Sequence, residues 1–67
     1  MKYAYKDITI LTVTHNSENV INSFLNNVNK KFKLIVVDNN SLDNTKLILK
    51  KDIRPYKTLF FNKIGLD

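Results

Sequence analysis

Cysteine and tryptophan are absent from this chain, and glycine, proline and histidine each occur once. The lack of cysteine excludes disulfides and thiolate zinc sites, and a single histidine cannot build a multi-histidine metal site. With one glycine, the chain contains neither the GxGxxG dinucleotide fingerprint nor the GxxxxGK[ST] phosphate loop. Composition therefore excludes several common ways of holding a metal or a nucleotide.

Long apolar runs are also missing, since none approaches the roughly 20 residues that span a bilayer. The amino-terminal stretch MKYAYKD lacks the apolar core of a secretory signal. We therefore expect a cytoplasmic protein, with peripheral association at the inner face of the membrane as an alternative.

The 67 residues allow one domain at most, and a chain of this length buries only about 60% of its unfolded surface. The hydrophobic share of 43% is ordinary for a globular protein and argues against disorder. The net charge of +5 would suit phosphate, nucleic acid or an anionic membrane. However, the lysines are spread along the whole chain, and clustering rather than net charge makes a binding patch. We therefore expect solvated lysines and no nucleic-acid partner.

Apolar, β-branched runs predict three short strands, over residues 8–13, 32–37 and 57–61. The first two runs, ITILTV and FKLIVV, are nearly continuous, which is typical of parallel strands buried on both faces. Each is followed by polar residues and then by a pattern that suits a helix.

The first predicted helix has Asn16 or Ser17 as its N-cap. The second covers residues 42–51, with Ser41 as the N-cap and Asp43 in the first turn, where the helix dipole favours an anion. The resulting β-α-β-α-β order predicts an α/β fold with a right-handed, doubly wound, three-stranded parallel sheet.

In such sheets, ligands bind beyond the carboxyl ends of the strands. Two polar loops are expected to lie there side by side, at residues 14–17 and 38–41. An acid at the end of a strand, Asp38, is placed to accept a hydrogen bond from a ligand. Asp38 also suits a simple turn, because Asp and Asn favour such positions, and both interpretations remain open at this point.

Other chemistry is weaker. A metal site would need Asp38 and Asp43 together as ligands. The position of Asp43 is already explained by the predicted helix start, where the helix dipole favours an anion. His15 has no acid at close spacing to orient it as a general base. Tyr3, Tyr5 and Tyr56 are scattered rather than grouped into a stacking surface.

The segments ITILTVTHNSENVINSFLNNV and KLIVVDNNSLDNT resemble the start of family 2 glycosyltransferases. In that family the first strand ends in T-[YFH]-N and the second in V-V-D-[DN]-x-S-x-D-x-T. The resemblance covers about residues 7–65. It implies a Rossmann-like half of a GT-A fold, here a three-stranded parallel βαβαβ unit. Residues 1–67 would then be a single partial domain, the amino-terminal nucleotide-sugar-binding half.

The resemblance also implies a nucleotide-binding set, which is Thr14, His15, Asn16, Asp38 and Asn39. The first three match the loop that wraps the base. Asp38 matches the acid that accepts a hydrogen bond from the base, usually from N3–H of uracil.

Other matching positions are expected to be structural or to depart from the family. Ser41, Asp43 and Thr45 match the family's helix start. Residues 62–65 resemble an N-x-G stretch, but Lys63 stands where a second asparagine is usual.

The family's metal-binding DxD and its catalytic base lie further along than this chain extends. We therefore expect no catalytic residue and no metal ligand here, and Mn²⁺ or Mg²⁺ only in a full-length enzyme. The expected ligand is a nucleotide-sugar, a UDP-sugar by resemblance, and glycosyl transfer by this chain alone is not expected.

The expected partner is a missing carboxyl-terminal half, or a second copy paired through the edge of strand 8–13. Two other functions remain open. One is a non-catalytic nucleotide-binding or assembly module, and the other is a small basic nucleic-acid-binding protein.

Overall fold

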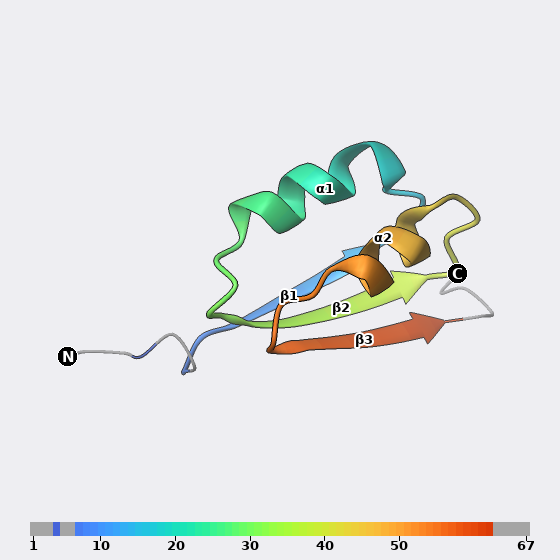
Figure 1. Cartoon of the computed structure of the whole chain (residues 1–67). Coiled ribbons are helices and arrows are strands. Elements are labelled where there is room, and N and C mark those ends of the chain that lie inside the picture. The colour runs from blue at the N-terminus through green and yellow to red at the C-terminus, as the bar shows by residue number, and fades with distance from the viewer. Residues whose placement is uncertain (1–3, 5–6, 63–67) are drawn as a thin grey trace.

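The computed structural model describes residue 4 and residues 7–62, and Figure 1 shows their arrangement. Strands and helices alternate along the chain: β1 (Thr9–Thr14), α1 (Glu18–Asn27), β2 (Lys33–Asn39), α2 (Thr45–Lys51) and β3 (Lys57–Asn62). The strands are parallel and their order is β1-β2-β3, which confirms the predicted α/β fold class. Within the described residues, no helix has the length and apolar character needed to cross a membrane.

The central strand β2 provides the middle of the core. Its residues alternate between buried and more exposed positions, and Leu34 and Val36 are inaccessible to solvent. These two side chains pack with Ile21 and Leu25 of α1 and with Leu49 of α2. Apolar and β-branched residues suit such a pleated, half-buried surface, which is why the strand predictions succeed.

Both helices lie on the same face of the sheet (Figure 1). Two crossovers of the same hand that run in the same direction across a sheet place both helices on one face. The prediction of a doubly wound sheet with strands buried on both faces is therefore wrong for the described residues. On the other face, here called the open face, Leu11, Val13 and Phe60 remain exposed.

The second helix begins later than predicted. It starts at Thr45 with Asn44 as its N-cap, so the predicted N-cap at Ser41 and helix start at residue 42 are wrong. Ser41 is unavailable because its hydroxyl and its amide both donate to Asp38. Asp43 consequently lies just before the helix rather than in its first turn.

A buried ion pair lies at the carboxyl end of α1. The Arg54 guanidinium donates through Nε to Asp52 Oδ2 at 2.6 Å, and through Nη2 to Asp52 Oδ1 at 3.2 Å. It also donates to the carbonyls of Leu25 (2.7 Å) and Val28 (3.2 Å), at the carboxyl end of α1. Cations and donors are favoured at this end of a helix, so Arg54 ties the segment before β3 to α1.

Lys57 closes the end of α2 in the same way. Its Nζ donates to the Leu49 carbonyl at 2.7 Å and also to the carbonyl of Asp52. Burial raises the pKa of the Asp52 carboxyl, but the hydrogen bond and charge of Arg54, with the charge of Lys57, lower it further, so the pKa lies below its ordinary value. Asp52 thus stays ionised between two cations.

We predict that Arg54→Met lowers the free energy of unfolding by about 3 kcal/mol, because it leaves a largely buried carboxylate and two helix carbonyls without their donor. Urea denaturation measures this change. Lys51→Met is the matched control, since it removes the same charge from an exposed position at the end of α2. Equal losses in the two variants would contradict a structural role for the Arg54 contacts.

Candidate functional site

Two polar loops meet at the carboxyl edge of the sheet. One joins β1 to α1, and the other joins β2 to α2. Thr14 and Asp38 are register partners at the ends of β1 and β2, so the two loops leave the sheet side by side. The structure therefore brings together residues 14–17 and 38–41, as the topology predicted.

Asp38 is the centre of this edge and is inaccessible to solvent. Its Oδ1 accepts hydrogen bonds from the Thr14 hydroxyl at 2.7 Å and the Ser41 hydroxyl at 2.6 Å. Its Oδ2 accepts from the Ser41 amide at 3.0 Å. Burial raises the pKa of this carboxyl, but the bonds from Ser41 and Thr14 outweigh it, with help from the charge of Lys46. The net pKa lies below the ordinary value, so Asp38 is a buried, fully partnered anion.

Ser41 joins this anion to the first loop. Its hydroxyl donates to Asp38 and accepts from the Asn16 amide at 2.8 Å. The Asn16 side-chain oxygen in turn accepts from the Leu42 amide at 2.7 Å. Asn16 and Asn40 have positive φ angles of 45° and 51°, a conformation that asparagine tolerates better than most residues. The asparagines therefore make the tight turns that let the loops interlock.

The two helix starts also cap each other. The Glu18 amide donates to Asp43 Oδ2 at 3.0 Å, and the Asn44 amide donates to Glu18 Oε1 at 3.0 Å. The Ser17 amide donates to the Thr45 hydroxyl at 2.8 Å. Neither N-cap residue uses its own side chain as a cap. Sequence reasoning missed this exchange, because it assigned Asp43 to its own helix.

Asp43 holds its place through Thr45. Its Oδ1 accepts from the Thr45 amide at 3.0 Å and from the Thr45 hydroxyl at 2.5 Å. Burial raises the pKa of Asp43, and the bonds from Thr45 and from the Glu18 amide lower it below its ordinary value. Asp43 is thus a structural anion that belongs to both loops.

His15 and Asn39 meet where the loops face solvent. His15 Nδ1 lies 2.6 Å from the Asn39 carbonyl oxygen. A carbonyl only accepts, so Nδ1 carries the proton in this contact. The Asn16 side-chain amide lies 3.4 Å from Nε2, the other ring nitrogen. The ring is therefore oriented by a backbone carbonyl and an amide.

Metal ligation has no support in this part of the molecule. Within residue 4 and residues 7–62, no three His, Asp or Glu side chains are grouped as a metal site. Asp38 and Asp43 each accept several hydrogen bonds from the protein itself. Among the described residues, these two carboxylates are therefore not arranged as ligands of a divalent ion. Tyr3, Tyr5 and Lys63, the residue that departs from the family's N-x-G stretch, lie outside the described residues.

The family model of glycosyl transferase family 2 matches residues 9–63 of this chain. The chain belongs to this family. Searches of curated proteins and of solved structures found no match. The family 2 assignment confirms the resemblance carried by the two strand–loop segments, and both interlocked loops lie within the matched range.

The lowered pKa of Asp38 predicts a specific acid sensitivity of this family 2 chain. The folded-state pKa lies below the unfolded value near 4, so this carboxylate contributes stability above that pH and loses it as the pH falls through the folded pKa. We expect Asp38→Asn to lower the free energy of unfolding by about 2 kcal/mol at pH 7. The variant should also lose stability less steeply than the wild type below about pH 4.

Urea unfolding at a series of pH values tests both expectations. A residual slope is expected in the variant, since Asp43 and Asp52 also have lowered pKa values. Asp7→Asn is the control, because it removes the same charge at an exposed position before β1. If the free energy of unfolding of Asp38→Asn falls as steeply in acid as that of the wild type, Asp38 does not make this contribution.

Proposed function

We propose that this chain binds the nucleotide of a nucleotide-sugar donor at the carboxyl edge of its sheet. The observation that carries the proposal is the interlocking of the two loops around the buried Asp38 carboxylate. Parallel α/β sheets bind ligands beyond this edge, and a site whose loops are already ordered loses little entropy on binding. Membership of glycosyl transferase family 2 supports a sugar-nucleotide as the ligand class.

In this proposal Asp38 is a positioning residue. Its carboxylate has no exposed surface, and its two oxygens already accept from Thr14 and Ser41. A base would reach it only after one of those donors moved. In this proposal Asp38 holds the loops, in place of the contact with the base that the family resemblance implies.

The base contact is assigned to His15 and Asn39. His15 is exposed, Asn39 is half-buried at the last position of β2, and their hydrogen bond joins them across the two loops. Uracil presents an N3–H donor between two carbonyl acceptors. An asparagine side chain offers both an acceptor and donors, so it is complementary to that edge. The proposed donor class is accordingly a UDP-sugar.

The proposed role is donor recognition, the step that precedes glycosyl transfer. Within the described residues, the only histidine is held by the Asn39 carbonyl, and the carboxylates of Asp38 and Asp43 are occupied by internal donors. The two carboxylates are therefore engaged in holding the loops rather than free to take a proton from an acceptor hydroxyl.

We predict that adding UDP shifts the amide NMR signals of residues 14–17 and 38–41 before any others. Asn39→Ala should weaken UDP binding about tenfold, the effect of one hydrogen bond to a bound ligand. Asn26→Ala is the control, because Asn26 lies on the exposed face of α1.

Ser41→Ala tests the positioning of the two loops without removing a residue that is proposed to contact the base. It removes a donor to Asp38 and an acceptor for the Asn16 amide, so it should weaken UDP binding and broaden the signals of both loops together. If UDP shifts amide signals only in other parts of the chain, the assignment of the nucleotide site to these two loops is wrong. Unchanged affinity in Asp38→Ala would contradict it equally.

A further inference from the structure

The fold gathers lysines that are scattered in the sequence. In each strand–helix–strand unit, the helix ends where the next strand begins, so these junctions lie together at the amino ends of the strands (Figure 1). Four exposed lysines lie at the junctions: Lys30, Lys31, Lys33 and Lys51. Together with Ile53 and Tyr56, which follow α2, they form what is here called the basic end.

The acidic residues are distributed differently. Three of them lie among the interlocked loops at the opposite end of the sheet: Glu18, Asp38 and Asp43. The described acids near the basic end are Asp52, whose Oδ2 lies 2.6 Å from Arg54 Nε, and Asp7, which precedes β1. The two ends of the described molecule therefore differ in the sign of their charge, and such a field orients the basic end toward an anionic surface.

Two exposed apolar groups lie among these lysines. Ile53 is 89% exposed and Tyr56 is 56% exposed, both in the loop between α2 and β3. This loop is fixed on both sides of Ile53, because Arg54 donates to two carbonyls at the carboxyl end of α1 and the Tyr56 carbonyl accepts from the Leu34 amide at 2.8 Å. The Arg54 bonds also bring the loop beside the turn that carries Lys30. Ile53 is thus held in the solvent next to cations.

We propose that the basic end docks on the surface of an anionic phospholipid bilayer. The lysines interact with the lipid phosphates, and each lysine near such a surface strengthens binding about fivefold. Ile53 and Tyr56 enter the boundary between headgroups and acyl chains, where amphipathic rings and apolar side chains are favoured.

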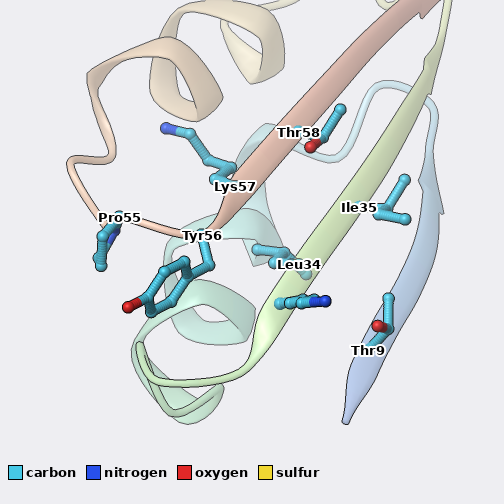
Figure 2. Close-up of a pocket in the computed structure, with 8 residues that line it drawn as sticks. Thr9, Leu34, Ile35, Pro55, Tyr56, Lys57 and Thr58 are labelled. Carbon is cyan, nitrogen blue, oxygen red and sulfur yellow. The ribbon is translucent and has the colours of Figure 1, made fainter. Parts of the chain in front are cut away.

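A hollow of about 280 Å³ lies at the same end and is lined by Lys33 and Tyr56, among others. Figure 2 shows Pro55 and Tyr56 where β3 begins, with Thr9 and Thr58 on the two outer strands. An ammonium group and hydroxyl groups are suitable donors to phosphate oxygens. In this proposal the hollow receives a lipid headgroup.

The apolar residues favour a bilayer over a nucleic acid. Both partners present phosphates, but a nucleic acid gains little from an exposed isoleucine, and one tyrosine does not make a stacking surface for bases. Exposure alone does not define the docking surface, since Leu42 is 85% exposed but lies beside Asp43, among the acids of the opposite end. Docking through the basic end leaves the proposed nucleotide site directed away from the lipid.

Co-sedimentation of the 67-residue chain with vesicles tests the docking. We expect binding to vesicles of equal parts phosphatidylglycerol and phosphatidylcholine, and none to phosphatidylcholine alone. Binding should weaken between about 0.1 M and about 1 M NaCl, as the Debye length falls from about 10 Å to about 3 Å. Lys51→Gln should weaken it about fivefold. Lys50→Gln is the matched control, because Lys50 Nζ lies 5.1 Å from the centre of the Phe61 ring, near the other end of β3.

The apolar contribution is tested in the same assay. Ile53→Ser should weaken vesicle binding about tenfold, whereas Leu42→Ser should leave it unchanged, with circular dichroism showing that both variants are folded. Because the chain contains no tryptophan, Ile53→Trp and Leu42→Trp each supply a single fluorescent probe. Anionic vesicles should shift the emission to the blue in Ile53→Trp and not in Leu42→Trp.

Several results would overturn the proposal. They are equal binding to neutral and anionic vesicles, equal effects of Lys51→Gln and Lys50→Gln, or a blue shift in Leu42→Trp rather than in Ile53→Trp. Binding of a DNA oligonucleotide without binding of vesicles, weakened by Lys51→Gln but not by Ile53→Ser, would overturn it in favour of a nucleic-acid surface. None of these measurements uses UDP, so their outcome is independent of the proposed nucleotide site.

Discussion

The buried negative charge of Asp38 is the constraint on which the carboxyl edge of the sheet depends. A carboxylate without access to water must be surrounded by donors, and here the donors come from two segments, Thr14 at the end of β1 and Ser41 after β2. Satisfying the charge therefore forces the loops together. His15 and Asn39 meet at the surface because the hydrogen bonds of the Asp38 carboxylate beneath them fix the course of both loops.

A second charge cluster closes the other end of the molecule. Arg54 and Asp52 hold the carboxyl end of α1, much as Asp38 holds the helix starts. Among the residues that the structure describes, the buried apolar core between them is small, with five residues. A core of this size gives limited positional information, since apolar contacts are not directional. Hydrogen-bonded charges at both ends therefore fix how the two helices lie on the sheet.

The sequence predicts the strands because runs of apolar, β-branched residues are a local signal. Their parallel order follows from the alternation of strands and helices along the chain. The proximity of the two loops follows from topology. The caps could not be predicted, because Ser41 and Asp43 had plausible local roles, yet they bond to Asn16 and Glu18, 25 positions away. The role of Arg54 was equally hidden, since only the fold brings it beneath α1. Strand hydrophobicity, finally, does not say which face receives a helix, and so the open face was missed.

The brevity of α2 has a consequence for how the chain folds. Seven residues are well short of the roughly 12–15 that make an isolated helix even marginally stable. The amide at its start is held by Glu18 of the other helix, and a carbonyl in its last turn is held by Lys57 of β3. The helix thus exists only where the remaining elements have already assembled. We therefore expect that neither βα half folds by itself and that the chain unfolds as one cooperative unit.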